Sequence, residues 1–133
     1  TYRQTGQRVQ AALDAAVATA PDTPRARLLA YLTASFAAPI ADGELLSTWL
    51  AFWSLTRTDA AIAHLHEEIY AENRRALEQL LQDYAPGQDH RLTAVALTAL
   101  VDGLWLELSL GDAPFAAQEA GHLAERWLDG LIR

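Results

Sequence analysis

The sequence predicts an all-α fold of six helices in a single domain. Apolar residues recur every three or four positions along most of the chain, as they do on one face of an α-helix. The strict alternation of apolar and polar residues that marks a half-buried strand occurs nowhere in the sequence. Proline and glycine, at positions 21, 39, 86–87 and 111–114, separate the periodic segments into helices.

The first half of the chain predicts three helices. Residues 2–19 carry an apolar stripe that ends before a proline. Residues 23–37 follow, with Asp22 or Thr23 as the capping residue and a proline in the first turn, where its missing N–H costs nothing. Residues 43–57 form the third helix, which carries most of the tryptophans.

The second half predicts three more helices. Asp59 is suited to cap the longest one, 59–83, which has an apolar side and a charged side. The next helix, 91–110, is apolar nearly all round, so we expect it to be covered on more than one side. A tight turn with glycine and proline then precedes an amphipathic last helix, 114–132.

Composition narrows the class of protein. The chain has 133 residues, of which 51 % are hydrophobic and 20 % charged, so it is long and apolar enough to bury a core. Its formal net charge is −7, its ten basic residues are all arginine, and they form no basic run. This balance argues against binding of nucleic acid by this segment and suits a cationic ligand.

Missing residue types add further expectations. Cysteine is absent, which rules out disulfides and thiolate metal sites and agrees with a cytoplasmic protein. The most apolar run, 94–110, is interrupted by Asp102 and Glu107, so we expect no membrane span. Methionine is absent even from position 1, so we expect Thr1 to lie inside a longer native chain.

The sequence offers no catalytic or metal-binding constellation. It contains no nucleophile elbow and no glycine loop for phosphate, so we expect neither an enzyme nor a bound cofactor. The segment 64–68 resembles a metal site at first, but on a helix His64 and Glu68 share a face that His66 does not. We therefore predict no metal site.

Three of the four tryptophans lie in two short apolar segments. By helical spacing, Trp49, Phe52 and Trp53 share one face, while Asp102 and Trp105 share a face of another helix. Aromatic rings beside a carboxylate are suited to a cationic, partly apolar small molecule. The competing interpretation is that these rings simply fill the core.

Asp102 is the one charge inside a long apolar stretch. A buried carboxylate needs a partner, because leaving it unpaired is costly. A ligand cation, a helix N-terminus, or a hydroxyl such as that of Thr98 or Tyr70 would each serve. From the residues alone, a structural role and a ligand contact are equally open.

The last two helices bear on assembly. Helix 91–110 has two apolar sides to satisfy, and helix 114–132 carries small residues that let another helix approach closely. Such a hairpin can pack against its two-fold mate as a four-helix bundle. The alternative is an ordinary intramolecular core. The expected dimer interface comprises Leu97, Leu104, Leu108, Ala120, Leu123, Ala124, Trp127 and Leu131.

Three segments, 24–28 (PRARL), 48–53 (TWLAFW) and 99–106 (ALVDGLWL), resemble the C-terminal domain of TetR-family transcriptional repressors, and most of all the choline-responsive BetI type that regulates glycine betaine synthesis. The resemblance extends over nearly the whole chain. Family members carry an N-terminal helix-turn-helix that binds operator DNA, and Thr1 would lie just after it.

The resemblance implies that 1–133 is a homodimeric effector-binding domain, in which the last two helices form the dimer bundle and the others enclose the pocket. Choline or a related cation would bind there and shift the DNA-reading heads, relieving repression. An uncharged hydrophobic or aromatic effector, or a helical module unconnected with DNA, are the alternatives. The residues that would surround the ligand are Trp49, Phe52, Trp53, Tyr70, Asp102 and Trp105.

Overall fold

The computed structural model describes residues 1–132, and throughout this range the chain is helical or irregular, with no strand. The predicted all-α fold is therefore confirmed. Six α-helices and one short 3-10 helix follow each other along the chain: α1 (Tyr2–Thr19), α2 (Pro24–Thr33), η1 (Ala34–Phe36), α3 (Gly43–Leu55), α4 (Ala60–Tyr84), α5 (Arg91–Leu110) and α6 (Ala117–Leu131).

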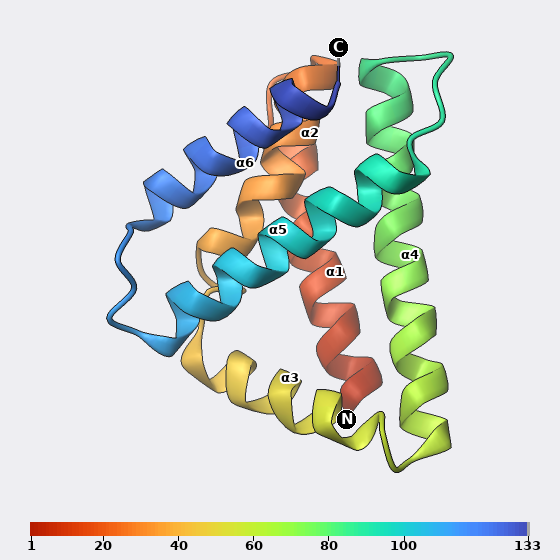
Figure 1. The fold of residues 1–133 in the computed structure, drawn as a ribbon, viewed down its shortest axis with the longest axis vertical. Helices are drawn as coiled ribbons and strands as arrows, with labels where there is room; N and C mark the ends of the chain where they lie inside the picture. The colour runs from red at the N-terminus through yellow and green to blue at the C-terminus, as the bar shows by residue number, and fades with distance from the viewer. Residues whose placement is uncertain (133) are drawn as a thin grey trace.

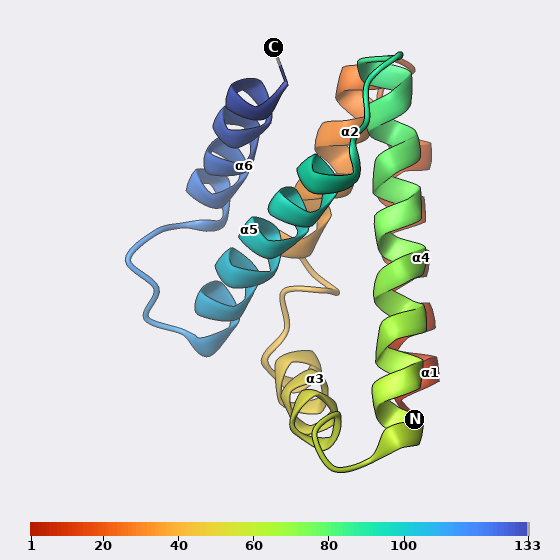
Figure 2. The ribbon, with the colours of Figure 1, turned by 45° about the vertical axis from the view of Figure 1, so that its right-hand side comes forward.

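The helices enclose a central space. The helices α1 and α4 run along each other, and α2 packs against both (Figure 1). Helix α5 crosses this layer diagonally, and α3 closes the end of the molecule at which α1 begins. Helix α6 lies on the outside, against α5 and α2 (Figure 2). The interior between α1 and α5 is where the candidate site lies.

All six helices contribute to one hydrophobic core. Gly6 on α1 lies against Ile69 on α4, and a Cβ at this position would lie 2.8 Å from Cδ1 of Ile69, so the isoleucine side chain would have to shift. Leucine and aromatic side chains fill most of the remaining interior, which is the largest favourable contribution to folding. The largest side chains that are fully buried are Tyr2, Leu28, Leu32, Leu77, Leu81, Leu97 and Leu128.

Polar side chains fix the starts of the helices. Thr23 caps α2 by accepting a hydrogen bond from the Ala26 N–H at 3.2 Å. Asp59 caps α4 by accepting one from the Ala61 N–H at 3.0 Å. Asp59 was predicted from the sequence, and the structure selects Thr23 from the two predicted candidates, Asp22 and Thr23. Asp42 caps α3 in the same way, and such caps satisfy N–H groups that have no partner inside the helix.

Three predicted helix boundaries need correction, and one of them is the end of the helix predicted for 43–57, which stops at Leu55. The predicted helix 23–37 is α-helical only to Thr33 and then tightens into the 3-10 helix η1, a common way for a helix to end. The last helix begins at Ala117 rather than at residue 114. Its start is set by Glu119, whose carboxylate accepts a hydrogen bond from the Ala116 N–H at 3.0 Å.

Within one chain, α5 packs against α6 as well as against α3 and α4, but part of its surface stays exposed. Its inner face includes Leu97 and Trp105, which are buried in the core. Its outer face leaves Leu92, Val95 and Leu110 at relative exposures of 66 %, 45 % and 64 %. The helix is thus covered on more than one side, as predicted, although the described residues 1–132 of a single chain leave these three side chains uncovered.

The composition of helix α5 corrects the sequence argument against a membrane span. By length and composition alone it is apolar enough to cross a bilayer, so Asp102 and Glu107 do not exclude a span as the sequence argument assumed. The core helix of a soluble protein passes the same test. Because α5 places one of its faces in the core, we explain its apolar composition by packing within the fold.

Candidate ligand-binding site

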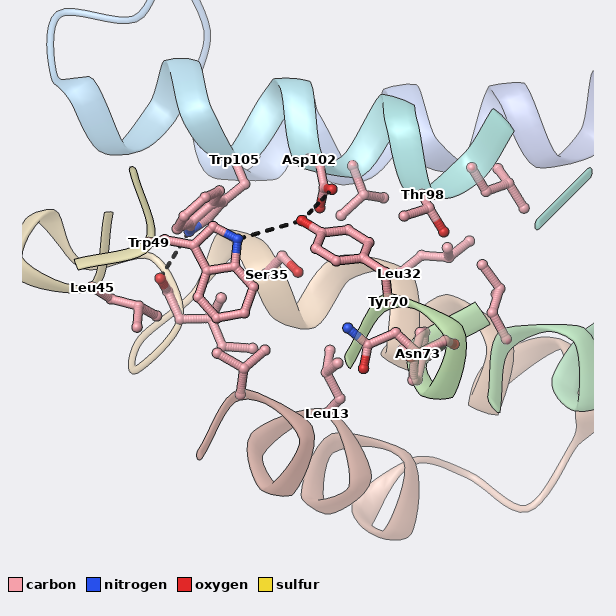
Figure 3. A pocket seen from close by; sticks show the side chains of 16 residues that line it. Leu13, Leu32, Ser35, Leu45, Trp49, Tyr70, Asn73, Thr98, Asp102 and Trp105 are labelled. Carbon is pink, nitrogen blue, oxygen red and sulfur yellow. Dashed lines mark hydrogen bonds between the residues drawn. The ribbon is translucent and has the colours of Figure 1, made fainter. Parts of the chain in front are cut away.

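A cavity of about 70 Å³ lies between helices α1 to α5 (Figure 3). Roughly 10–15 Å³ on the same measure suffices for one water molecule, so the cavity has room for several waters or a small organic molecule. Its walls are mainly apolar and aromatic with a few polar groups, which is the usual make-up of a ligand pocket.

Aromatic rings from four elements of the fold form part of the wall. Trp49 and Trp105 meet edge to face, with ring centroids 6.5 Å apart, and Trp49 lies 6.4 Å from Tyr70. The Trp105 indole N–H donates a hydrogen bond to the Ile40 carbonyl at 2.9 Å, which fixes the position of this ring. Tyr31 completes the set. Electron-rich ring faces of this kind attract cations.

Asp102 is the only charged residue in the lining of the cavity. Its carboxylate accepts a hydrogen bond from the Tyr70 hydroxyl at 2.9 Å, and the Trp49 indole N–H donates a longer one, of 3.4 Å, to the same hydroxyl oxygen (Figure 3). Of the partners that the sequence left open for Asp102, the structure therefore has the Tyr70 hydroxyl. The lining includes no basic side chain that could neutralise the carboxylate.

The electrostatics of this pair follow from its burial. Burial raises the pKa of Asp102 to about 6, although the hydrogen bond from Tyr70 opposes that rise. Burial and the neighbouring Asp102 charge raise the pKa of Tyr70 far above its ordinary value, so the phenol keeps its proton and remains the donor. At neutral pH the cavity wall thus carries a mostly ionised carboxylate that has one neutral hydrogen-bond donor.

Four of the six predicted ligand residues line the cavity, namely Trp49, Tyr70, Asp102 and Trp105. Phe52 and Trp53 do not line it. Phe52 stacks on the ring of Tyr2, with centroids 4.5 Å apart and planes at 12°.

Trp53 instead meets Trp105 edge to face, with ring centroids 6.5 Å apart. Helical spacing correctly turns the aromatic face of α3 inward, but the buried ring of Tyr2 occupies the space beside this face.

An aromatic cluster that the sequence analysis missed extends from the cavity to the start of α1. The Tyr2 hydroxyl lies 2.7 Å from Nδ1 of His66, and the rings of His66 and Tyr70 are 4.5 Å apart. Burial raises the pKa of Tyr2 to about 12 and lowers that of His66, so both side chains are neutral at pH 7. The cluster connects the cavity wall to the first turn of the domain.

Polar residues in the lining were also missed. Ser35, Asn73 and Tyr31 face the cavity without having been singled out from the sequence. A signal existed for Asn73, which lies four residues after Ile69 and four before Leu77, on the apolar side of α4. A polar residue at such a position can be satisfied by other residues, by water or by a ligand.

Residues 24–133 match the family described as "BetI-type transcriptional repressor, C-terminal". The match takes in most of the chain, including the cavity residues on α3, α4 and α5. The chain belongs to this family. The predicted resemblance to TetR-family regulators of the BetI type is confirmed.

Curated relatives of this BetI-type domain support the same family assignment. The chain is 36 % identical over 118 residues to the HTH-type transcriptional regulator BetI of Burkholderia thailandensis, a match that covers 86 % of this chain and 59 % of the relative. It is 36 % identical over 112 residues to the protein of the same name from Paraburkholderia phymatum, covering 82 % and 56 %. The chain thus spans less than two thirds of the length of these relatives, which are regulators rather than enzymes.

A solved structure has the same fold as this BetI-type domain. It is the crystal structure of a candidate transcriptional regulator from Pseudomonas aeruginosa PAO1, with a TM-score of 0.90 and 39 % sequence identity. The match covers 98 % of this chain and 65 % of that chain.

The histidine-rich segment of this BetI-type domain is divided between two faces of α4. His64 is exposed and forms an ion pair with Glu68 at 3.0 Å, whereas His66 points to the aromatic cluster. Within residues 1–132, no three His, Cys, Asp or Glu side chains are placed to hold a metal ion. The geometric argument that His66 lies away from His64 and Glu68 is thus supported.

The residues expected at a dimer interface fall into two groups. Leu97, Leu104, Ala120 and Ala124 are buried within the chain itself, so they have almost no surface left for a partner. The others lie partly or fully exposed on α5 and α6: Leu108, Leu123, Trp127 and Leu131. Trp127 is 54 % exposed, which is unusual for an apolar aromatic side chain of this size.

Proposed function

We propose that this chain is the effector-sensing and dimerisation domain of a cytoplasmic TetR-family repressor. Its effector is choline or a closely related quaternary ammonium compound, and the repressor controls genes of glycine betaine synthesis. The observation that carries the proposal is an interior cavity in which aromatic rings surround a single carboxylate, Asp102, with no basic counter-charge in the lining.

The chemistry of the cavity supports a quaternary ammonium ion. Such an ion has no N–H to donate, so it is held by ring faces and by the charge of a carboxylate rather than by directed hydrogen bonds. Trp49, Tyr70 and Trp105 supply the rings. The raised pKa of Asp102 supports the same conclusion, because a group that is costly to ionise in an empty cavity gains most when a cation enters.

The proposed mechanism links cavity occupancy to DNA binding. In the proposed whole protein, a helix-turn-helix domain precedes α1 and binds operator DNA as part of a homodimer. The cluster of Tyr2, His66 and Tyr70 connects the cavity wall to the first turn of α1. A ligand that pulls on Tyr70 or Asp102 would therefore move the segment that carries the DNA-binding domain, and repression would be relieved.

One observation favours a second candidate function, the sensing of an uncharged hydrophobic or aromatic effector. Asp102 already accepts a hydrogen bond from Tyr70, so its carboxylate has a structural partner without any ligand. Most of the remaining lining is leucine, isoleucine, valine or aromatic. In this case the carboxylate would hold Tyr70 in place, and the rings would form an apolar wall.

Isothermal titration of the chain with choline and with its neutral carbon isostere, 3,3-dimethylbutanol, separates the two candidates. We expect choline to bind at least tenfold more tightly than the isostere, and Asp102→Asn to abolish this preference. Glu107→Gln is the matched control, because Glu107 is an exposed carboxylate on α5 outside the cavity lining. Equal binding of both compounds, or binding of the isostere alone, would contradict the cation assignment.

A further inference from the structure

The cavity lies behind side chains that have little exposure to solvent. Each of its lining residues is buried or half-buried in the single chain. Because the interior of a protein is closely packed, a ligand that reaches Asp102 has to pass where side chains move aside. The passage should lie where the fewest side chains separate the cavity from open space.

A groove of about 720 Å³ lies between α1 and α3, next to the cavity. Alanine side chains end at Cβ, and four of them leave the space beside α1 unfilled: Ala11, Ala12, Ala15 and Ala16. Most of the other lining residues belong to the connection before α3 and to the first turns of α3. The groove is much larger than the cavity, so it can admit any ligand that the cavity holds.

One layer of apolar side chains separates the groove from the cavity. Val9, Ile40 and Leu45 line both spaces. They come from α1, from the connection before α3 and from the first turn of α3, respectively. In Figure 3, Leu45 lies at the end of the cavity that Trp49 forms.

These three residues differ in how easily they can move. The Ile40 carbonyl accepts a hydrogen bond from the Trp105 indole N–H at 2.9 Å, which holds this part of the chain to the core. A valine in a helix has essentially one rotamer, so Val9 is stiff. Leu45 is half-buried and can change rotamer without any movement of the backbone. It is therefore the side chain that opens the layer most easily.

The hollow between α1 and α4 is a poorer route. Among the described residues 1–132 it shares only Asn73 with the cavity. Beside this hollow Ile69 packs so closely on Gly6 that a Cβ there would lie 2.8 Å from Cδ1 of Ile69. Entry between these helices requires more movement than the rotation of one leucine side chain.

We propose that the effector enters and leaves the cavity through the groove between α1 and α3, and that the side chain of Leu45 is the gate between the two spaces. Val9 and Ile40 form the fixed edges of this gate. The inference rests on the proposed function only in that the cavity binds a small molecule. It applies to a cationic and to an uncharged effector alike.

Stopped-flow tryptophan fluorescence measures entry and exit separately, because Trp49 and Trp105 line the cavity. Choline is the probe, and 3,3-dimethylbutanol replaces it if choline does not bind. We expect Leu45→Ala to raise the association and dissociation rate constants together by about tenfold, while the Kd changes less than about threefold. A residue that only contacts the ligand would instead change the dissociation rate constant and the Kd together.

Obstruction of the groove should have the opposite effect on both rates. The chain has no cysteine, so a single introduced cysteine reacts with a thiol reagent at one position only. Thr48 is exposed on α3 and lines the groove. We expect Thr48→Cys modified with N-phenylmaleimide to bind and release the probe at least about tenfold more slowly than the unmodified variant.

Gln7→Cys is the matched control for the modification. Gln7 is exposed on α1 and lines the hollow between α1 and α4 instead of the groove. Modification of Gln7→Cys with the same reagent should leave both rate constants unchanged.

The outcomes distinguish this inference from the proposed function. If the unaltered chain binds neither probe, the proposed function is wrong and the inference falls with it. If a probe binds but modification of Thr48→Cys does not slow its exchange, or modification of Gln7→Cys slows it as much, the inference alone is overturned. Thr48 and Gln7 are both exposed, so this comparison decides the matter even where Leu45→Ala does not fold.

Discussion

Asp102 is a charged residue in a cavity wall that is otherwise neutral, so its ionisation affects the stability of the folded chain. The pKa of Asp102 rises from an ordinary 3.8 to about 6 in the folded protein. Between these values the folded state binds the proton more tightly than the unfolded state does. The resulting stabilisation is fully present below pH 3.8 and is lost as the pH rises through about 6.

Asp102→Asn should therefore stabilise the empty domain at neutral pH. The neutral amide can still accept the hydrogen bond from Tyr70, and it avoids a cost of up to about 3 kcal/mol for ionisation. We expect the advantage of the variant to grow as the pH rises from 4 to 7. Urea unfolding across this range measures it.

Glu107→Gln, on the exposed side of α5, serves as the control for Asp102→Asn and should show no such growth. A difference between Asp102→Asn and the unaltered chain that stays constant with pH would refute the assignment of the raised pKa.

Tyr70 affects the pKa of the Asp102 carboxylate, and Tyr70→Phe separates this effect from the packing of the ring. Because the hydrogen bond from Tyr70 lowers the pKa of Asp102, its loss should raise that pKa further. On the proposed function, choline affinity at pH 7 should then fall severalfold and recover at pH 8.5, where the carboxylate ionises again. Calorimetry at the two pH values gives the ratio of the choline affinities.

The control for this variant is Tyr31→Phe. Its hydroxyl donates to the backbone carbonyl of Asn73 rather than to Asp102. Tyr31→Phe should lower stability by about 1 kcal/mol, as the loss of one neutral hydrogen bond does, and leave the pH dependence of binding unchanged. The same recovery at high pH in both variants would show that Tyr70 acts through packing alone.

Among the elements, Arg25 joins three helices. From the first turn of α2 its guanidinium donates to Asp129 at 2.9 Å and Glu125 at 3.0 Å on α6, and to the Tyr84 hydroxyl at 2.8 Å on α4. These acidic partners hold the pKa of Arg25 well above its ordinary value. Helix α6 lies outside the main layer, so this connection contributes to its attachment.

Removal of the guanidinium should loosen α6 preferentially. We expect Arg25→Gln to lower the free energy of unfolding by about 1 kcal/mol, since the network is partly exposed to solvent, and to speed hydrogen exchange in α6. Arg25→Lys should recover only part of the loss, because an ammonium cannot span both carboxylates. Arg57→Gln, on the exposed surface, is the control, and an equal effect there would contradict the role of Arg25.

The sequence predicted the helices well because their signals are local. Apolar periodicity and caps such as Asp59 depend on residues within one or two turns, and the structure places them as expected. Boundaries were less certain where a tightened turn or a capping side chain shifts an end, as at Thr33 and Ala117. These details depend on contacts that periodicity does not contain.

The site was predictable in part for the same reason. Spacing shows which residues share a face, and it correctly turned Trp49, Asp102 and Trp105 inward. It does not show which ring from a distant helix occupies the adjoining space. Tyr2 is 64 residues from His66 in the sequence, and its burial beside Phe52 is what separates that residue from the cavity.

At the scale of the whole molecule, five of the seven exposed large hydrophobic side chains among the described residues lie on α5 and α6. Leu92, Val95 and Leu110 on α5 and Trp127 and Leu131 on α6 remain exposed in the single chain. Exposed apolar side chains that gather on two adjacent helices are typical of a surface that a partner covers. A second copy of the same pair, related by a two-fold axis, would complete a four-helix bundle.

Trp127→Glu tests this assembly with little effect on the fold, because Trp127 is 54 % exposed in the single chain. In the proposed dimer the new carboxylate would lose its hydration against the partner, and this cost together with the lost apolar contact should weaken dimerisation at least about a hundredfold. Sedimentation at micromolar concentration should then change from dimer to monomer, while circular dichroism stays helical.

Leu50→Glu is the matched control, since Leu50 is 36 % exposed on α3, a helix that is not part of the proposed interface. It should leave the dimer intact. If both variants sediment as the unaltered chain does, the exposed face of α5 and α6 does not hold two copies together. If the unaltered chain is itself a monomer at micromolar concentration, the α5 and α6 pair alone is insufficient for assembly, and the proposed dimerisation role of this domain is wrong.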